Sequence, residues 1–433
     1  MTRALSLTRR PLTRRQALLA GLAAGAAAGL AHPALARAAR PALRVGAILP
    51  LAGSGLPPVG INQSVPAESA RKGLVIAIDD LERATPAGTD LHRLLPANAP
   101  DAESARRAAE RLVERDGATV LIGGFSTADA QAIGAVARDA GALFINIAAP
   151  ADALRRDFCG GSALHLEAAS SSYLAALTDL YAGDGRRNWY LIHQDDPVHT
   201  GLLAQAQADL RRAGAKVAGI SAVSGDSTRF RAALTDLRGS GADACLLLTD
   251  WLVQLNLLAT AESDGVAVPI TGFPWAATQT RDFYNRCRQL APTVGCAPRV
   301  ALWEARLDTS GAAPRNADFL ARWRVPMDAS AWAAQAALLL AAEAAQATGS
   351  IRGGDLAAWL SDAAQTPEIG KRGAAFDPAD GQLRQPLYAV RVNPDATTEL
   401  TPQAMTDRAE LLARLDPPAA AAATCGGPVA SAG

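Results

Sequence analysis

Short apolar runs alternate with amphipathic segments along most of the chain. The clearest example is the stretch from Ala118 to Pro150. Its apolar run from Val120 to Ile122 is typical of a buried parallel strand, and two glycines then lead to a helix start at Ser126. A second apolar run, from Leu143 to Ile147, stops at two alanines and a proline. The stretch is therefore predicted to form a strand, a helix and a second strand.

Small and polar residues follow both strands of this unit. In open parallel sheets, ligands bind beyond the carboxyl ends of the strands, which here are the segments around Phe125, Ser126 and Thr127 and around Ala148 and Ala149. Both segments are predicted to face one crevice. Ser126 and Thr127 also suit a helix N-cap, and the two roles are compatible.

The same alternation recurs on both sides of this unit. Predicted strands cover 42–49, 91–95, 163–166, 189–192, 217–223, 244–248, 268–271, 299–303 and 383–392. Predicted helices cover 67–83, 102–116, 170–181, 202–213, 227–237, 331–345, 356–364 and 405–415. Strands alternating with helices over two separate stretches predict an α/β chain with two doubly wound, Rossmann-like lobes.

The composition agrees with two lobes and excludes several functions. The 433 residues are 49% hydrophobic and 19% charged, which is enough for two ordinary cores, and the formal net charge is zero. No basic face favours nucleic acid. Ser69-Ala70-Arg71-Lys72 fits S-x-x-K, but no K-T-G follows, and the chain has no phosphate-binding G-K-[ST] loop or G-x-S-x-G elbow. We therefore expect neither catalysis nor a bound cofactor.

The first 38 residues are typical of a targeting segment. Arginines at 9, 10, 14 and 15 precede an Ala/Leu/Gly-rich run, and Ala34-Leu35-Ala36 supplies a cleavage site. The arginine pair favours twin-arginine export over ordinary secretion, which stays open. Since no other run reaches 18 apolar residues, the mature chain is predicted to have no membrane span and to lie in the periplasm.

Export makes the cysteines candidates for disulfide bonds. Cys287 and Cys296 flank a short loop and are predicted to pair. Cys159 and Cys425 could close a long loop that holds the C-terminal tail. Cys245 lies within an apolar run, where a buried free thiol is the expected state.

The order of elements resembles the branched-chain amino-acid type of periplasmic binding protein, the type I fold. The strings RVGAILPLAGSG, KGLVIAIDDL and TVLIGGFST carry the resemblance, which covers about 42–393. It implies three chain crossings between the lobes, a ligand in the cleft between them and closure about a hinge. The implied lobes are 42–160 with 300–350 and 161–299 with 351–397, followed by a C-terminal helix and tail over 398–433. The resemblance also implies that the protein is a monomer and that its partner is an ABC transporter permease.

The C-terminal half has a narrower resemblance. The strings ALWEARLDTSGAAPRNADFLARW, PMDASAWAAQAALLL and DGQLRQPLYAV, with the late Cys425, look like the binding proteins encoded with PQQ-dependent alcohol dehydrogenases. This subgroup implies a link to periplasmic alcohol oxidation. It leaves open whether the chain carries a ligand or serves as a non-transport partner of the dehydrogenase system.

The family pattern implies roles for the predicted crevice residues. Ser126 and Thr127 fall where the family holds the carboxylate of the ligand, and Ala148 and Ala149 fall at the adjacent backbone pair. Pro150 replaces a threonine of the pattern and removes a hydroxyl and an N–H donor.

The second lobe departs further from the pattern. His199 or Val198, and Asp250 or Trp251, fall at aromatic positions of the family. Trp275 or Pro274 falls where the family has a carboxylate for the ammonium group of the ligand. Aromatic residues at several strand ends, without that carboxylate, predict a larger and more apolar or aromatic ligand than a free amino acid. Asp250 keeps a cationic ligand open.

A metal site is a further alternative. Asp195, Asp196, His199 and Asp250 follow two predicted strands, and such carboxylates suit a hard cation or its chelate. The more ordinary interpretation of Asp195-Asp196 is a solvated helix start. We predict a solute-binding protein of an ABC transporter; the alternatives are a dehydrogenase partner and a carrier of a metal chelate.

Overall fold

The computed structural model describes most of the chain from residue 42 to residue 416. The described ranges are 42–51, 61–85, 92–159, 161, 163–224, 227–309, 311–362, 364–365 and 368–416. The predicted targeting segment 1–38 and Cys425 lie outside these ranges, as does most of the loop after the first strand.

The first lobe is built on a five-stranded parallel sheet in the order β2-β1-β3-β4-β5. Its strands are β1 (Leu43–Leu49), β2 (His92–Asn98), β3 (Val120–Gly123), β4 (Leu143–Asn146) and β5 (Ala163–His165). The helices of this part are α2 (Ile61–Ala84), α3 (Ala102–Glu110) continued by a π-helical turn (Arg111–Arg115), α4 (Thr127–Asp139), α5 (Ala153–Asp157), α11 (Ala312–Trp323), α12 (Ala329–Thr348) and α13 (Gly353–Leu360). Strands β1, β3 and β4 are almost wholly buried, which explains their continuous apolar runs, whereas the edge strand β2 is mostly half-buried or exposed.

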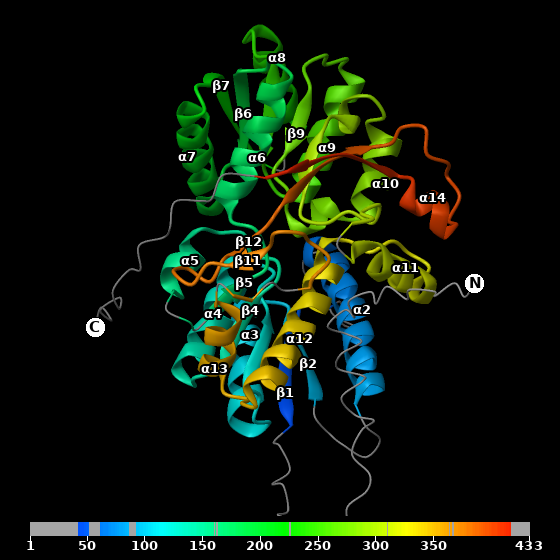
Figure 1. The fold of residues 1–433 in the computed structure, drawn as a ribbon. Helices are drawn as coiled ribbons and strands as arrows, with labels where there is room; N and C mark the ends of the chain where they lie inside the picture. Colours follow the sequence, from blue (N-terminus) through cyan, green and yellow to red (C-terminus); the bar gives the residue numbers. More distant parts are fainter. Residues whose placement is uncertain are drawn as a thin grey trace, which may run out of the picture. The chain divides into compact units, whose positions relative to one another are not determined.

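The second lobe is built on a four-stranded parallel sheet in the order β7-β6-β8-β9. Its strands are β6 (Asn188–Gln194), β7 (Lys216–Val223), β8 (Ala244–Leu248) and β9 (Ile270–Gly272). Its helices are α6 (Ser170–Gly183), α7 (Pro197–Arg212), α8 (Ser227–Gly239), α9 (Trp251–Ser263) and α10 (Arg281–Leu290). Figure 1 shows this lobe in green above the first one.

A small antiparallel sheet, β10-β13-β14, lies beside the second lobe in Figure 1. It contains β10 (Arg299–Ala301), β13 (Leu387–Val392) and β14 (Ala409–Leu415). A short hairpin of β11 (Ala375–Phe376) and β12 (Leu383–Arg384) precedes β13, and His165 of β5 forms a bridge with Gln382. The chain thus passes between the lobes after β5, after β10 and before β13. The predicted fold class, two doubly wound lobes with a three-crossover hinge, is confirmed.

Several predicted elements need correction. Helices α9 and α10 were not predicted, and the predicted strand over 383–392 is two strands separated by Gln385 and Pro386. The predicted helix over 405–415 is wrong, because only α14 (Pro402–Thr406) is helical and the chain then forms β14. Six residues of β14 pair with β13, and this tertiary pairing outweighs the helical propensity of the sequence AELLARL.

Two segments lie in a different lobe from the one that the family pattern implied. Strand β5 pairs with β4 in the first sheet, and α13 packs on β4, although residues 161–299 and 351–397 were both expected in the second lobe. The packing of α13 depends on Gly353. A Cβ atom there would lie 2.4 Å from the Leu143 nitrogen, so only glycine lets the helix approach the strand so closely.

The predicted disulfide between Cys287 and Cys296 is wrong, since both are free. Cys287 is fully buried in the core, whereas the Cys296 thiol donates to the Pro292 carbonyl at 3.0 Å. Cys245 is a buried free thiol, as predicted, and burial raises its pKa. Pairing of Cys159 with Cys425 stays a prediction.

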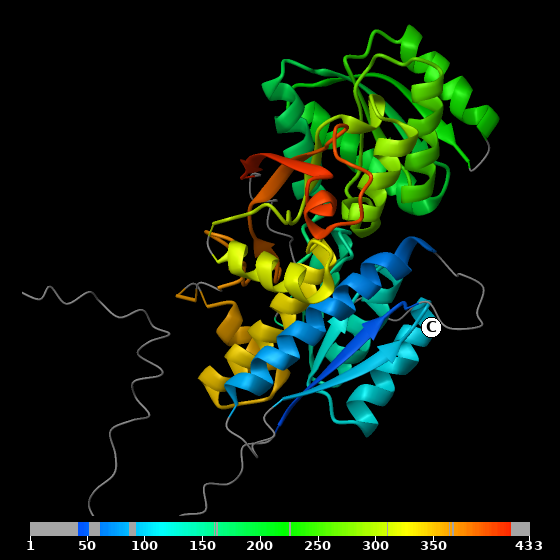
Figure 2. The same cartoon turned by 90° about the vertical axis from the view of Figure 1, so that its right-hand side faces the viewer.

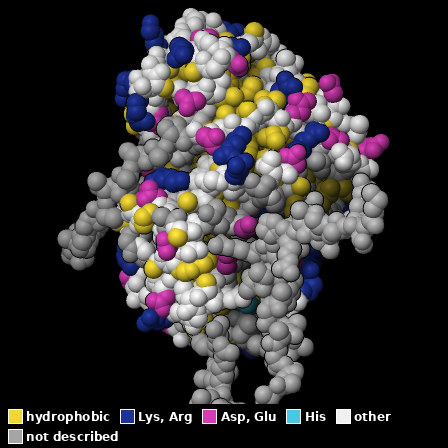
Figure 3. All heavy atoms as spheres, in the orientation of Figure 1, with side chains coloured by type: hydrophobic (Ala, Val, Ile, Leu, Met, Phe, Trp, Pro, Cys, Tyr) yellow, Lys and Arg dark blue, Asp and Glu magenta, His cyan; other side chains and the backbone are white. Residues whose placement is uncertain are grey.

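On the face shown in Figure 3, several basic side chains gather along the upper left edge. Over the rest of the visible described surface, basic and acidic side chains are mixed with hydrophobic ones. Of the helices within the described ranges, none is long and apolar enough to cross a bilayer.

The centre of the first lobe is the packing of α2 against α12. Helix α12 is rich in alanine, and Ala331, Trp332 and Ala333 are all fully buried. Gly73 of α2 lies directly against the α12 backbone, because an ideal Cβ at Gly73 would be 2.1 Å from the Ala331 carbonyl oxygen. The two helices could not pack this closely with any side chain at that position.

Gly73→Ala should destabilise the protein by about 1–3 kcal/mol, because the added methyl group has to push two helix backbones apart. The matched change Gly354→Ala adds the same methyl group at an exposed position of α13, where nothing lies within 4 Å, and should stabilise by about 0.5–1 kcal/mol. Urea unfolding of both variants tests this. If both variants changed the free energy of unfolding by the same amount, the close contact between α2 and α12 would not restrict the residue at position 73.

Buried polar side chains hold the first chain crossing. Arg155 donates to the carbonyls of Ala149 and Glu167 at 3.1 and 2.7 Å and to Gln382 Oε1 at 2.8 Å. Glu167 accepts a 2.6 Å hydrogen bond from the Tyr173 hydroxyl. Burial raises the pKa of Glu167 to about 7, against the opposing effects of Tyr173, Arg155 and Lys371.

Glu167→Gln should change how stability depends on pH. Between its unfolded pKa and about pH 7 the folded chain keeps a proton on Glu167 that the unfolded chain has released, so this contribution is lost as the pH rises. The variant should therefore gain stability relative to the wild type from pH 5 to pH 8, measured by urea unfolding. Exposed Glu114→Gln should show no such trend, and a constant offset for Glu167→Gln would refute the assignment.

Candidate functional site

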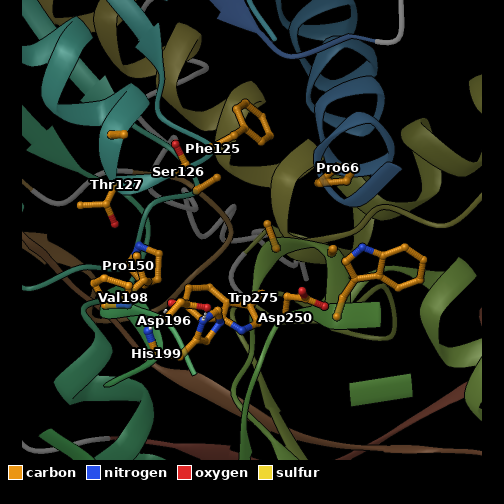
Figure 4. Close-up of a pocket in the computed structure, with 16 residues that line it drawn as sticks. Pro66, Phe125, Ser126, Thr127, Pro150, Asp196, Val198, His199, Asp250 and Trp275 are labelled. Carbon is orange, nitrogen blue, oxygen red and sulfur yellow. Dashed lines mark hydrogen bonds and ion pairs between the residues drawn. The ribbon is translucent and has the colours of Figure 1, made fainter. Parts of the chain in front are cut away.

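A cavity of about 530 Å³ lies between the two lobes. The first lobe contributes Pro66, Phe125, Ser126, Thr127, Ala128, Ala148 and Pro150. The second contributes Asp196, Pro197, Val198, His199, Asp250, Trp251, Trp275, Ala276 and Ala277. In Figure 4, Phe125, Ser126 and Pro66 lie across the cavity from Asp250 and Trp275.

The loop between β3 and α4 forms one wall. Gly124 has a φ of +87°, and a Cβ atom there would lie 2.9 Å from Asn146 Oδ1, so the turn requires glycine. Ser126 caps α4 by accepting from the Asp129 N–H at 3.1 Å. The described residues provide no acceptor for the N–H groups of Thr127 and Ala128. These two donors, at the positive end of the α4 dipole, suit a negatively charged or carbonyl oxygen in the cavity.

The backbone after β4 is held by Asn146 instead of being free for a ligand. Asn146 Oδ1 accepts from the N–H groups of Ala148 and Ala149 at 3.3 and 3.0 Å, and Nδ2 donates to the Ala149 carbonyl at 2.8 Å. Ala149 is fully buried and does not line the cavity. The expected role of this backbone pair as a ligand donor is therefore not supported, because a side chain of the same strand already uses both N–H groups.

The start of α7 forms part of the opposite wall. Asp196 caps this helix through the His199 N–H at 3.0 Å and also lies 2.6 Å from His199 Nδ1. Burial opposes the charge of Asp196, but the hydrogen bonds and charge of His199 outweigh it and keep the Asp196 pKa below its usual value. Both oxygens of this carboxylate thus have partners within the helix start.

The start of α9 provides a second carboxylate. Asp250 Oδ1 accepts from the N–H groups of Leu252 and Val253, both at 2.9 Å, which makes Asp250 the N-cap. The described residues offer no hydrogen-bond partner to its other oxygen. Asp250 can therefore accept from a ligand while it still caps the helix.

Trp275 is fixed by its surroundings. Its Nε1 donates to the Thr249 carbonyl at 2.8 Å, and its ring centroid lies 4.6 Å from that of Phe273 and 5.6 Å from that of His199. A ring held on three sides presents a rigid aromatic surface at low entropic cost to binding.

The cavity is mostly apolar, and no lysine or arginine of the described chain lines it. Asp195 is exposed and lies outside it, and the described residues contain no group of three His, Cys, Asp or Glu side chains arranged for a metal ion. Asp196 is already engaged with His199. The metal interpretation therefore lacks the donor set that it needs.

Eight of the nine residues predicted for the site line this cavity, and Ala149 is the exception. Sequence reasoning missed Pro66 and left Asp196 as part of the metal alternative. Pro66 was missed because α2 begins at Ile61, six residues before the predicted start, and carries the proline within the helix. The capping pattern Asp-Pro-x-His at 196–199 was a signal that could have placed Asp196 beside His199.

Comparison with known proteins identifies the family. A family model described as periplasmic binding protein matches residues 42–398, most of the chain. No curated protein matches the sequence.

Solved structures of low sequence identity share the fold. A branched-chain amino-acid ABC transporter ligand-binding protein of Burkholderia xenovorans is 17% identical with a TM-score of 0.74, over 87% of this chain and 96% of that one. A solute-binding protein of R. palustris in complex with benzoate is 18% identical with a TM-score of 0.70, over 89% and 99%.

A solute-binding protein of Rhodopseudomonas palustris in complex with 3,4-dihydroxybenzoic acid is 15% identical, with a TM-score of 0.69 over 87% and 98%. Identities this low support the fold and leave the ligand open, whereas the family model covers both lobes. The chain belongs to the periplasmic binding protein family.

Proposed function

We propose that this protein binds a small, apolar or aromatic-containing ligand between its lobes and delivers it to an ABC transporter permease from the periplasm. The observation that carries the proposal is the cavity between the lobes, lined by Trp251 and Trp275 on one side and Phe125 on the other. Aromatic faces on both lobes can enclose a flat or apolar ligand and exclude water from it.

The polar groups of the cavity fix which end of a ligand faces which lobe. The hydroxyl of Thr127 and the two N–H groups at the start of α4 favour a carboxylate or carbonyl oxygen on the first lobe. Asp250 and Trp275 face them across the cavity and favour a hydroxyl, amine or ring edge. A ligand with a polar ring substituent directed toward Asp250 would be similar to the dihydroxybenzoic acid that the Rhodopseudomonas palustris relative binds.

Closure of the lobes is the proposed mechanism. A ligand that touches both walls makes all its contacts only when the lobes approach, so it stabilises the closed form by its preference for that form. Residues 1–38 would direct export before this function begins. The resemblance of the C-terminal half supports a link to PQQ-dependent alcohol oxidation, and a non-transport role beside the dehydrogenase is the alternative.

Native mass spectrometry of the mature protein from the periplasm of its own host should reveal a bound organic molecule that is lost on denaturation. Small-angle scattering should then show a smaller radius of gyration when that molecule is added back. An apo mass, with no compaction on adding benzoates or branched-chain amino acids, would favour the partner role.

Removing the aromatic surface should weaken binding. Trp275→Ala is expected to lower the affinity for the co-purified ligand by about tenfold or more, which corresponds to about 1.4 kcal/mol. Isothermal titration calorimetry measures it. Trp359 of α13 lies away from the cavity, so the control change Trp359→Ala should leave the affinity unchanged. An equal loss of affinity in both variants would indicate a general loss of folding.

The hydroxyl of Thr127 should contribute to binding a carboxylate. Thr127→Val keeps the shape and removes only the hydroxyl, so we expect a loss of about 0.5–1.5 kcal/mol in binding and little change in melting temperature. Ser126→Ala also removes the helix cap and should lower stability by about 1 kcal/mol. Unchanged affinity in Thr127→Val would mean that the Thr127 hydroxyl does not contact the ligand.

A further inference from the structure

A second cavity, of about 720 Å³, lies on the other side of the junction between the lobes. Helix α2 and the loop before α12 border it from the first lobe, the start of α10 from the second, and the region of α14 from the C-terminal part. Figures 1 and 2 both show α14 above and α2 below this junction. Its lining includes Glu68, Lys72, Asp282, Asp328, Leu400 and Arg408.

This cavity is separate from the cleft. Pro66 of α2 faces the cleft, whereas Val65 and Ser69 face the second cavity. On the opposite side, Ala277 faces the cleft and Thr280 faces the second cavity. The contact of α2 with the 3-10 helix Ala276–Gln279 therefore forms a wall between the two spaces.

Each carboxylate in the second cavity already has a partner. Glu68 binds Arg71 through two hydrogen bonds of 2.6 and 2.7 Å, and Asp282 accepts from Arg286 Nε at 2.9 Å. Asp328 accepts from the Ser69 hydroxyl at 2.7 Å and caps α12. The partners of Asp328 are uncharged, and the charge of this carboxylate acts on Arg281 and Lys72 across the cavity.

Two of the cations have no such partner. Arg281 pairs with buried Glu304 at 3.0 Å, but no carboxylate of the described chain lies within ion-pair distance of Lys72 or Arg408. Arg408 is only 4% exposed and its side chain donates to the Glu399 carbonyl at 3.0 Å, while among the described residues its Nε has no hydrogen-bond partner. Burial and the positive charges of Arg288 and Arg281 lower the Arg408 pKa, against the opposing charge of Asp282.

Apolar side chains border these cations. Leu400 is 78% exposed and Val65 is 39% exposed, and both line the cavity with Met405 and Val325. Exposed apolar side chains beside the buried Arg408 and the partly buried Lys72 suit a molecule that is both apolar and negatively charged.

We propose that this second cavity binds a small organic anion with an apolar portion, its anionic group between Lys72 and Arg408 and its apolar portion against Leu400 and Met405. The anion supplies the counter-charge that buried Arg408 lacks and so offsets the cost of burying this arginine.

The test uses hexanoate as the probe and the lysine side chains as reporters. The chain has three lysines, Lys72, Lys216 and Lys371, so reductive methylation with ¹³C gives few signals. Hexanoate should shift the Lys72 signal and leave that of exposed Lys216 in place, while hexanol, which lacks the charge, should have no effect. An equal response to hexanol, or none to hexanoate, would overturn the proposal.

Variants locate the site. Lys72→Gln and Arg408→Gln should each weaken hexanoate binding at least fivefold by calorimetry, while the matched change Lys216→Gln should alter it less than twofold. If Arg408→Gln does not fold, the result for Lys72→Gln alone tests the proposal, because Lys72 is only partly buried and its replacement should not prevent folding. Trp275→Ala should retain the Lys72 shift; its loss would place the anion in the cleft and refute a second site without touching the proposed function.

Discussion

The shape of the cleft depends on hydrogen bonds from buried side chains at the point where the chain leaves the first sheet. A chain that crosses between lobes abandons the regular pairing of its strands, and each buried carbonyl or N–H group then needs another partner. After β4, Asn146 and Arg155 supply most of these hydrogen-bond partners. Gln382, more than 200 residues later in the sequence, also contributes. The loop that borders the cavity is therefore set by side chains behind it.

Residues with two structural roles are also found at the helix starts around the cavity. Ser126, Asp196 and Asp250 each cap a helix and each line the cleft, so the residues that end the loops also present the polar groups. Asp196 is fully used by His199, whereas Asp250 keeps one oxygen for other contacts. Two carboxylates that look alike in the sequence thus have different capacities to bind a ligand.

Much of the first lobe and most of the cleft could be predicted, because buried parallel strands give continuous apolar runs and their carboxyl ends meet at one edge. Ala149 was misplaced because the sequence does not reveal that Asn146 turns back on the backbone. The C-terminal strand was mistaken for a helix because its pairing with β13 is a long-range contact. The predicted disulfide between Cys287 and Cys296 was wrong for a similar reason, because two cysteines that are close in sequence need not have thiols that point toward each other.

The packing of α2 against α12 also bears on how the chain folds. Ser69 and Asp328, which bond across this contact, are 259 positions apart, so the first lobe cannot complete its core until most of the chain is available. The second lobe is nearly continuous in sequence and needs no such delay. Contacts between distant residues slow folding, and the lobe that begins the chain is therefore expected to be the later one to reach its native state.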